Sequence, residues 1–369
     1  MSTLTRPYAD RPATASDYLL DFVGLVSGLI VVVSLLGNLL VIYVIRHKDF
    51  YPLIRPYILS LAVSDFAGPI STYWMTVFSC LKRQQWQFGQ SGCTFYGFMQ
   101  SYCAMLSICC ITGIAVERYR SIKVGSSAKP HTVLVLAIWI YPLFFSLPPV
   151  LGWSSYVVQG FGTICTFQFL EDSWQSRSFV LWFFMPGFSL PVFVLCFCYI
   201  RIFKAIHKRY RSNKASLRLS RQVSANNTST LPEENERQLS LARLLDPERE
   251  RSISQQQVLS LKQQSRSMRT IFIVVVAFFV AWFPFTAVAL IGQFGPGDLI
   301  GPYTVTFVTL LAKTSTAYNP VIYGLSDNLF RRILWHICTK DYEDTSFDTR
   351  NIELNTRARR TLFSGAALV

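Results

Sequence analysis

Seven long segments almost free of charged residues constrain this chain more than any other feature. A membrane-spanning α-helix needs about 20 consecutive apolar residues. Each segment meets or exceeds that length: 22–45, 56–81, 84–116, 130–170, 178–200, 270–297 and 299–326. Only the second and seventh contain a charged side chain, Asp65 and Lys313. The pattern predicts an all-α membrane protein, a seven-transmembrane-helix bundle.

The composition argues against the other explanation, a large soluble protein with buried helices. The 369 residues are 51% hydrophobic and only 15% charged, whereas soluble domains average about 25% charged residues. The net charge of +14 raises the question of nucleic-acid binding. The basic residues lie in the connections between spans and alternate by side, so we expect no nucleic-acid partner.

The alternation of basic residues predicts the orientation of the chain. One side carries the basic residues of 46–48, 118–129, 201–269 and 331–332, and the loops on the other side carry few, namely Lys82, Arg83 and Arg177. Basic loops stay in the cytoplasm. We therefore expect the N-terminus outside and the C-terminus inside, with membrane lipid around the spans. Residues 1–18 do not resemble a cleavable signal, so the first span is expected to direct insertion.

The apolar spans and the polar segments that flank them divide the chain into four predicted parts. Residues 1–18 are predicted to form an extracellular tail, 19–325 the transmembrane domain, 326–338 an amphipathic membrane-surface helix and 339–369 a cytoplasmic tail. The long third inner loop, 201–269, is basic at both ends, and we expect these ends to extend the fifth and sixth helices. Its middle, about 212–255, has a composition typical of disorder.

Most of the nine cysteines lie within spans, where they are expected to pack as small apolar side chains. Cys93 and Cys165 fall on the outer, oxidising side, which favours a disulfide between them. Cys80 lies close to the same surface and is an alternative partner. Cys338 follows the amphipathic segment and is a candidate for palmitoylation. No metal site is expected.

Polar residues and prolines recur inside the spans where a simple membrane anchor needs none. Proline inside a membrane helix frees backbone groups that polar neighbours must satisfy. Asn38, Asp65 and Asn319 are candidates for such a polar seam. The other features are Glu117-Arg118-Tyr119 at the end of span three, Trp139, Pro191, Trp282-x-Pro284 and Asn319-Pro320-x-x-Tyr323.

Taken together and in this order, these features resemble the rhodopsin-like class of G-protein-coupled receptors over residues 20–338. The resemblance implies a plasma-membrane receptor that signals to a heterotrimeric G protein and is regulated by arrestin and a receptor kinase. It also implies that Glu117, Arg118 and Tyr119 serve coupling, and that the helices around Pro284 and Pro320 move on activation. Such a protein is not an enzyme.

Lys313 narrows the resemblance to opsins. A charged lysine in the middle of a membrane helix costs about 2.5–3.5 kcal/mol on insertion scales. Lys313 lies six residues before Asn319, where opsins bind retinal, and Gly152-Trp153-Ser154-x-Tyr156 also resembles opsins. Burial favours the neutral amine, which can condense with an aldehyde. The resemblance implies a light-activated receptor with 11-cis retinal bound through a Schiff base on Lys313.

The resemblance also implies the walls of a retinal pocket. Aromatic and small side chains from spans three, five, six and seven would surround the polyene. The candidates are Tyr96, Gln100, Ser101, Met105, Phe183, Gly187, Phe188, Phe278, Trp282, Phe285, Thr309, Ala312 and Thr316.

The chain departs from opsins in the counterion. A buried cation needs an anion nearby, but Tyr96 and Gln159 stand where opsins place a carboxylate. Tyr96 indicates a non-vertebrate type, and some cnidarian opsins look like this chain. Three hypotheses remain: an unprotonated Schiff base in the dark, an anion such as chloride held by Gln159, Tyr96 or threonines (Thr72, Thr76 or Thr309), or an acid from a loop (Glu171, Asp172 or Asp298).

Two other functions remain open at this point. A retinal photoisomerase would share Lys313, but the intact Glu117-Arg118-Tyr119 and the basic third inner loop favour signalling. A receptor for a diffusible acidic ligand would use Lys313 as a salt-bridge partner. A microbial-type ion pump is disfavoured because the spans lack a string of carboxylates for proton relay.

Overall fold

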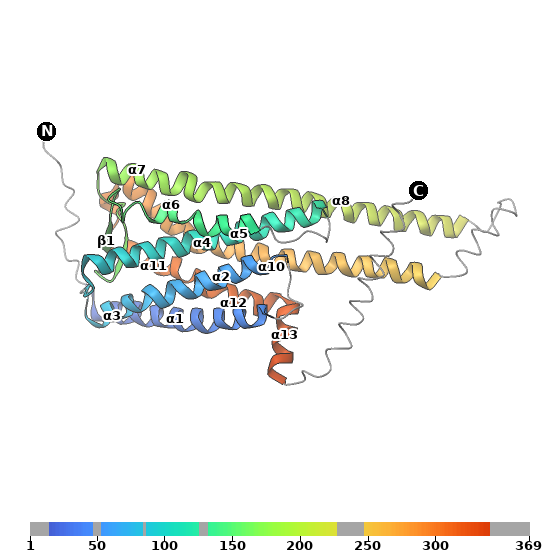
Figure 1. The fold of residues 1–369 in the computed structure, drawn as a ribbon, viewed down its shortest axis with the longest axis horizontal. Coiled ribbons are helices and arrows are strands. Elements are labelled where there is room, and N and C mark those ends of the chain that lie inside the picture. Colours follow the sequence, from blue (N-terminus) through green and yellow to red (C-terminus); the bar gives the residue numbers. More distant parts are fainter. Residues whose placement is uncertain (1–14, 47–52, 84–85, 125–131, 227–246, 340–369) are drawn as a thin grey trace.

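Long helices run side by side in a bundle that is helical apart from one short hairpin (Figure 1). The computed structural model describes residues 15–46, 53–83, 86–124, 132–226 and 247–339. The seven apolar segments each cross this bundle. The predicted seven-helix architecture is confirmed.

Three spans are each one uninterrupted α-helix: α1 (Asp17–Ile45), α4 (Gly89–Val124) and α10 (Pro247–Phe294). Ser16 caps α1, because its side chain accepts a hydrogen bond from the amide of Leu19. In α10, Pro284 lies inside the helix, where it removes one backbone donor.

The other four spans are built from pieces. The second is α2 (Arg55–Gly68), the π-helix η1 (Pro69–Tyr73) and α3 (Trp74–Leu81). The fourth is α5 (Thr132–Ile140) and α6 (Leu143–Ser146). The fifth is α7 (Trp174–Trp182), the π-helix η2 (Phe183–Ser189) and α8 (Leu190–Asn226). The seventh, which follows the short 3-10 helix η3 (Gly297–Leu299), is α11 (Pro302–Lys313) and α12 (Ser315–Ser326).

Length and hydropathy alone recognise fewer spans than the sequence windows do, in part because the helices of the fourth and seventh spans are individually short. Among the described residues, four continuous helical stretches are long and apolar enough to cross a membrane: Asp17–Ile45, Gly89–Lys123, Trp174–Lys208 and Arg269–Phe294. The second, fourth and seventh spans are divided at Pro69, Pro142 and Thr314. π-Helical turns in membrane helices often lie at functional sites.

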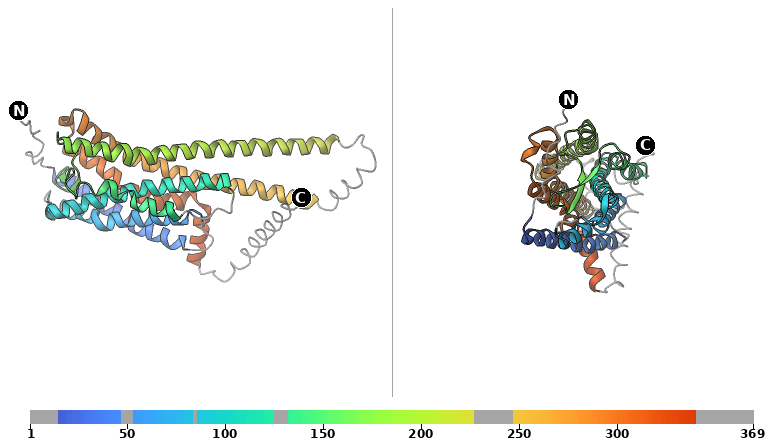
Figure 2. Two further views of the ribbon diagram at one scale, coloured as in Figure 1. Left: turned by 45° about the horizontal axis from the view of Figure 1, so that its top comes forward. Right: turned by 90° about the vertical axis from the view of Figure 1, so that its left-hand side faces the viewer.

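A hairpin lies across the mouth of the bundle at one end (Figure 2). Strand β1 (Tyr156–Gln159) pairs antiparallel with β2 (Ile164–Phe167), and Val158 faces Cys165. A disulfide joins Cys165 to Cys93 near the start of α4. The predicted pairing is confirmed, and Cys80 is a buried free thiol.

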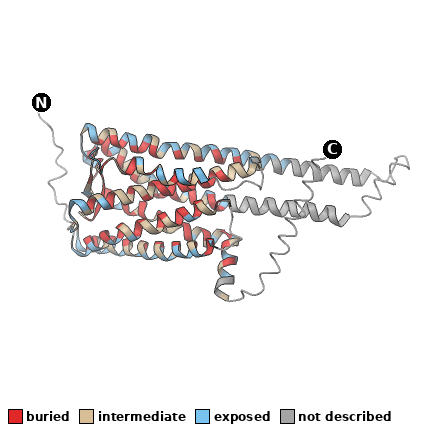
Figure 3. Cartoon of the chain, viewed as in Figure 1, coloured by how far each residue is buried: buried red, intermediate tan, exposed pale blue. Residues whose placement is uncertain are grey.

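The inner faces of the spans are buried and their outer faces are apolar and exposed (Figure 3). Phe193 and Phe307, for example, are 70% and 65% exposed. An apolar outer surface of this extent would be unfavourable in water but matches the acyl chains of a bilayer. The described part of the molecule is therefore arranged as a membrane protein.

Several predicted boundaries need correction. The third inner loop is helical through Asn226 and again from Pro247, so the prediction of disorder over 212–255 is wrong for 212–226 and 247–255. Residues 227–246 lie outside the described part. Helix propagation adds one hydrogen bond per residue, which lets α8 and α10 continue beyond the bundle (Figure 1).

Three smaller differences concern the ends of elements. The first helix begins at Asp17, inside the predicted tail. Pro191 lies in the first turn of α8, where its missing amide is tolerated, and the interruption of the fifth span is the π-helix containing Pro186. The surface helix α13 (Asn328–Thr339) starts two residues later than predicted and runs across the bundle axis (Figure 1).

Candidate functional site

Lys313 is the last residue of α11, at the break in the seventh span. Its side chain is only 1% exposed. The break at Thr314 is stabilised locally, because the Thr314 hydroxyl donates to the carbonyl of Leu311 at 2.6 Å. The sequence therefore places a basic side chain at an interruption of a membrane helix, facing inward.

Neutral groups surround the amine of Lys313. Nζ donates a hydrogen bond to Oγ1 of Thr76 at 2.8 Å, and the Thr76 hydroxyl is 2.8 Å from that of Tyr96. Nζ also lies 4.8 Å from the ring centroid of Tyr73 and 5.4 Å from that of Tyr96. Within the described residues, Lys313 forms no salt bridge.

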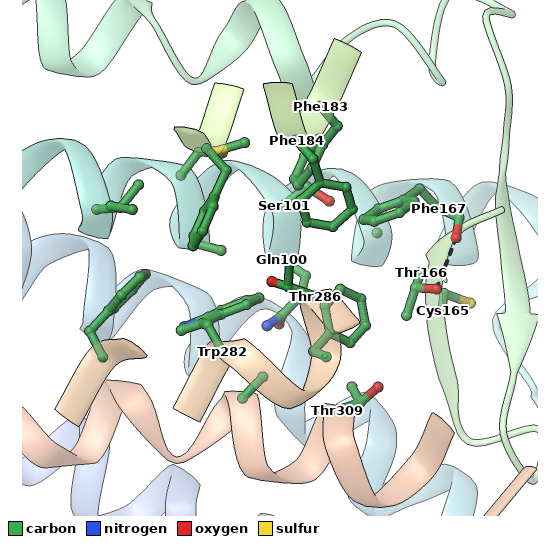
Figure 4. Close-up of a pocket in the computed structure, with 18 residues that line it drawn as sticks. Gln100, Ser101, Cys165, Thr166, Phe167, Phe183, Phe184, Trp282, Thr286 and Thr309 are labelled. Carbon is green, nitrogen blue, oxygen red and sulfur yellow. Dashed lines mark hydrogen bonds between the residues drawn. The ribbon is translucent and has the colours of Figure 1, made fainter. Parts of the chain in front are cut away.

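An apolar pocket lies beside this lysine, among α4, the η2 segment, α10, α11 and β2 (Figure 4). It contains about 630 Å³ of space not occupied by atoms, including open space at its mouth. Its walls are mainly aromatic or small: Gly97, Gln100, Ser101, Ala104, Met105, Ile108, Cys165, Thr166, Phe167, Phe183, Phe184, Phe188, Phe278, Trp282, Phe285, Thr286, Thr309 and Ala312.

Most of the pocket residues predicted from the sequence line this space. Ten do so: Gln100, Ser101, Met105, Phe183, Phe188, Phe278, Trp282, Phe285, Thr309 and Ala312. Tyr96, Gly187, Thr316 and Gln159 do not line it. Tyr96 instead contacts Lys313, and Thr316 lines a smaller neighbouring cavity with Tyr73 and Gln100.

Gln159 reaches the pocket only indirectly. It is buried in β1, and its side-chain oxygen accepts a hydrogen bond of 3.0 Å from Thr166, which lines the pocket. Its amide nitrogen is buried without a hydrogen-bond partner, as is Oγ1 of Thr309. The outer end of the pocket therefore has buried donors available.

Phe167 is the most important pocket residue that the sequence analysis missed. Its ring centroid lies 4.9 Å from that of Phe183 and 6.0 Å from that of Phe285. It comes from β2, two residues after the disulfide-bonded Cys165. Side chains alternate between the two faces of a strand, so Cys165 and Phe167 lie on one face of β2. This alternation is the sequence signal that could have predicted Phe167 in the pocket.

The π-helix η2 accounts for a second missed residue, Phe184. Phe183, Phe184 and Phe188 all line the pocket. The resemblance to opsins implied Phe183 and Phe188 but not Phe184. Adjacent side chains on a regular α-helix point about 100° apart. Figure 4 shows Phe183 and Phe184 directed towards the same space.

Trp282 links the pocket to the seventh span. Its indole nitrogen donates to Oγ of Ser315 at 3.1 Å, just after the break that follows Lys313. Its ring is stacked with Phe278, with centroids 5.9 Å apart. A change in pocket shape would therefore reach both α10 and α12 through one side chain.

Hydrogen bonds connect the residues of the predicted polar seam to neighbouring spans. Nδ2 of Asn319 donates to Asp65 at 2.6 Å, and the Ser107 hydroxyl donates to the same carboxylate at 2.9 Å. Asn38 donates to the carbonyls of Ser34 and Thr316, both at 2.9 Å. These bonds tie α1, α2 and α4 to α12 next to Pro320.

At the other end of α4, the Glu117 carboxylate is fully buried. It accepts a hydrogen bond of 2.9 Å from the Tyr57 hydroxyl and forms an ion pair of 2.7 Å with Arg120. Tyr119 packs edge-on against Phe197 of α8. Tyr323, buried in α12, lies 6.2 Å from the ring of Phe330 in α13. Glu117 and Tyr119 thus lie at the end of α4 opposite the hairpin.

Comparison with known proteins shows to which family the chain belongs. Residues 37–323 match the family described as 7 transmembrane receptor (rhodopsin family). The chain belongs to this family. It is a multi-pass membrane receptor by fold, and its similarity to opsins agrees with the resemblance inferred from its residues.

This rhodopsin-family chain is 30% identical over 336 residues to the melanopsin of Mus musculus, covering 88% of the chain and 57% of that relative. It is 26% identical over 343 residues to the Gq-coupled rhodopsin of Mizuhopecten yessoensis, covering 89% and 62%. The chain thus spans about three-fifths of the length of these relatives. The crystal structure of squid rhodopsin matches with a TM-score of 0.75, 22% identity and 92% coverage of each chain, which supports the fold.

Proposed function

We propose that this receptor is an opsin, a light-activated G-protein-coupled receptor with retinal bound covalently through Lys313. The observation that carries the proposal is the buried Lys313 beside an aromatic pocket in a rhodopsin-family bundle. A lysine in this position would be costly without a function. Condensation with an aldehyde would give the side chain such a function.

The residues present fit retinal. The pocket walls are apolar and aromatic, as a polyene requires, and Thr309 and Ala312 of the same helix as Lys313 form part of them. Nζ bonds to Thr76, and Gln100 lines both this pocket and the small cavity that Tyr73 lines, so a ligand attached to Nζ would extend from the cavity into the pocket. Retinal, proposed as the 11-cis isomer, would supply light absorption and isomerisation.

The three hypotheses for the charge partner of the proposed Schiff base can be compared with the contacts in the structure. The three loop acids that could fold inward, Glu171, Asp172 and Asp298, are all exposed. Asp172 forms an ion pair with Arg177, and Glu171 accepts a hydrogen bond from Gln168. An unprotonated Schiff base, or an anion such as chloride near the free donors of Gln159 and Thr309, fits these contacts better.

The proposed signalling role uses the opposite end of the bundle. Glu117, Arg118 and Tyr119 would serve G-protein coupling there, and Asn319, Pro320 and Tyr323 would carry the movement of the seventh span. Arrestin and a receptor kinase are proposed further partners. The proposed setting is the plasma membrane, with the N-terminus outside and the C-terminus in the cytoplasm.

Palmitoylation of Cys338 stays a prediction, because its side chain lies outside the described part of the structure. The resemblance to cnidarian opsins also stays a prediction.

The deciding experiment is the absorption spectrum of the purified protein after addition of 11-cis retinal, with and without chloride, beside Lys313→Ala. We expect a retinal adduct, fixed by borohydride, that Lys313→Ala lacks. A visible band that moves to the ultraviolet without chloride would identify an anion partner, and an ultraviolet band in both buffers an unprotonated Schiff base. An adduct that survives Lys313→Ala would contradict the proposal.

Signalling is tested separately by light-dependent nucleotide exchange on a heterotrimeric G protein. We expect exchange by the pigment and its loss in Arg118→Ala, with the absorption spectrum retained. A pigment that isomerises retinal but never drives exchange with any G protein would favour the photoisomerase. A protein that responds to a soluble acid and forms no retinal adduct would favour the diffusible-ligand receptor.

A further inference from the structure

The amine of Lys313 occupies a site formed by three neutral side chains, which we call the tyrosine box: Tyr73, Thr76 and Tyr96. They are 2%, 1% and 0% exposed, respectively. They come from three elements, η1, α3 and α4. A site so deeply buried has no solvent to stabilise a cation, so its own side chains must do so.

The geometry of the box suits a cation. The faces of aromatic rings carry negative charge density and attract a cation within about 6 Å of the ring centroid. Nζ lies within this distance of both Tyr73 and Tyr96, at 4.8 and 5.4 Å. The Thr76 oxygen completes the site by accepting a hydrogen bond of 2.8 Å from Nζ.

Two contacts hold the ring of Tyr96 in place, and the course of the second span positions Tyr73. Tyr96 is fixed by the 2.8 Å hydrogen bond between its hydroxyl and that of Thr76, and by edge-on packing against Trp86 at 5.6 Å. Tyr73 ends the π-helix η1 and lies three residues before Thr76, so both side chains leave the second span on one face. The interruption in this span therefore positions two of the three members of the box.

The groups around the box carry no opposite charge. Besides the two tyrosines, the titratable group that interacts with Lys313 is the thiol of Cys80 on α3. Asp65 is engaged by Asn319 and Ser107 instead. The described part of the chain gives Lys313 no salt bridge from any element packed against it.

The box also adjoins the pocket. Gln100 lines both the large aromatic pocket and the small cavity that Tyr73 lines. A nitrogen attached to a ligand in the large pocket can therefore remain beside Tyr73 while the ligand extends along α4 and α10.

We propose that the tyrosine box takes the place of a carboxylate, with the rings of Tyr73 and Tyr96 and the Thr76 hydroxyl stabilising the protonated nitrogen at Lys313. The inference rests on the proposed function. The rings act as neutral groups, so no buried negative charge is required. Tyr73 contributes through its ring and not through its hydroxyl.

The test compares leucine with phenylalanine at each tyrosine. Tyr73→Leu and Tyr96→Leu remove a ring, whereas Tyr73→Phe and Tyr96→Phe keep the ring and remove only the hydroxyl. Each pigment is formed with 11-cis retinal, and the pH at the midpoint of the conversion between the ultraviolet and visible bands is measured, with and without chloride. Acid denaturation then quantifies bound retinal in every sample.

We expect each leucine variant to move the midpoint about one unit to lower pH, a tenfold change that corresponds to about 1.4 kcal/mol for one cation–π contact. Tyr73→Phe should stay within a few tenths of a unit of the wild type. Thr76→Val, which removes the acceptor at nearly constant volume, should also lower the midpoint. The shifts should occur in both buffers.

Tyr102→Leu is the matched control, because this tyrosine is on α4 but bonds to the carbonyl of Trp139 and stacks on Phe98. Its midpoint should not move. A leucine variant that binds no retinal while its phenylalanine partner does would also support a role for the ring. The proposal is overturned if the leucine and phenylalanine variants all have the midpoint pH of the wild type. It is also overturned if neither the leucine nor the phenylalanine variant forms pigment at either tyrosine while Thr76→Val keeps the wild-type midpoint.

Failure of the proposed function would look different. In that case the wild type itself would form no retinal adduct through Lys313. A wild-type pigment with unmoved midpoints in all variants would leave the opsin function intact and reject only the box.

Discussion

At the scale of single residues, Gly97 decides how closely the hairpin can approach α4. A Cβ at this position would lie 2.1 Å from Cδ1 of Tyr156, well inside van der Waals contact. The Tyr156 ring is itself buried, and its hydroxyl donates to the carbonyl of Ser146 at 2.9 Å. The glycine is therefore needed for close packing and not for backbone conformation.

We predict that Gly97→Ala lowers the free energy of unfolding by about 1–3 kcal/mol, because the methyl group would displace a buried ring. The measurement is thermal unfolding of the purified protein in detergent. Gly28→Ala is the control, since a Cβ there meets nothing within 4 Å, and it should be neutral or stabilising by up to about 1 kcal/mol. Equal effects of the two substitutions would contradict this account.

Asn319 is a second residue whose role is defined by one contact. It donates to Asp65 at 2.6 Å in a site where both side chains are buried. Removal of one partner leaves a buried polar group unsatisfied, which costs more than the bond itself contributes.

We predict that Asn319→Ala lowers the free energy of unfolding by about 1–3 kcal/mol, and that Asp65→Asn in the same chain recovers part of the loss by removing the buried charge. Thermal unfolding of the two single variants and the double variant measures this coupling. Asn328→Ala changes an exposed asparagine in α13 and should have little effect. Additive losses in the double variant would exclude the coupling.

At the scale of elements, α4 holds the site together. It contributes Gln100 and Ser101 to the pocket and Tyr96 to the box around Lys313, and the Cys93–Cys165 disulfide ties it to β2. Through that bond α4 also fixes Phe167, which faces the pocket from the hairpin. The disulfide therefore positions one wall of the site.

We predict that Cys93→Ala with Cys165→Ala strongly reduces pigment formation with 11-cis retinal. The disulfide closes a separation of 72 residues, for which loop-closure entropy gives a stabilisation on the order of 4 kcal/mol. Pigment yield and thermal unfolding measure the loss. Cys196→Ala, which changes an exposed free cysteine in α8, is the control, and a similar loss there would argue against a specific role for the disulfide.

At the scale of the whole molecule, the bundle has two chemically different ends. The hairpin and pocket lie at one end, and Glu117 lies at the other with the extended helices α8 and α10 (Figure 1). The proposed orientation places the first end outside the cell. Ligand chemistry and partner binding would then occur on opposite sides of the membrane.

We predict opposite labelling of two engineered cysteines in whole cells by a membrane-impermeant maleimide. Trp174→Cys, at an exposed position at the start of α7, should react in intact cells. Trp335→Cys, exposed on α13, should react only after permeabilisation. The reverse pattern would contradict the orientation. The unmodified chain supplies the background, since its exposed Cys196 lies within the fifth span.

We also predict that loss of retinal destabilises the whole bundle. The ligand would fill a pocket lined by four spans and the hairpin, and anything that binds only the folded state stabilises it. The thermal midpoint of the pigment should therefore exceed that of the same sample after hydroxylamine and light. Lys313→Ala, treated identically, should show no difference.

The sequence by itself determined the seven spans and the position of Lys313 within the seventh span. These features follow from local composition, because each span must be apolar along its own length and each loop must be basic or polar according to its side. The sequence favoured the Cys93–Cys165 pairing, and the structure excluded the alternative, Cys80. Ten of the pocket residues could be predicted for a related reason, since the resemblance to opsins supplies the arrangement of the helices.

Only the tertiary structure placed Tyr73 beside Lys313 and turned Phe167 into the pocket. Tyr73 ends the π-helical interruption at 69–73, which rotates the side chains of the second span towards the seventh. Phe167 reaches the pocket from the hairpin that the disulfide holds against α4. No local periodicity encodes such a rotation, because it is set by packing against neighbouring spans. The sequence already indicated that the usual carboxylate is missing, but the ring faces of Tyr73 and Tyr96 around Lys313 became visible only in the folded molecule.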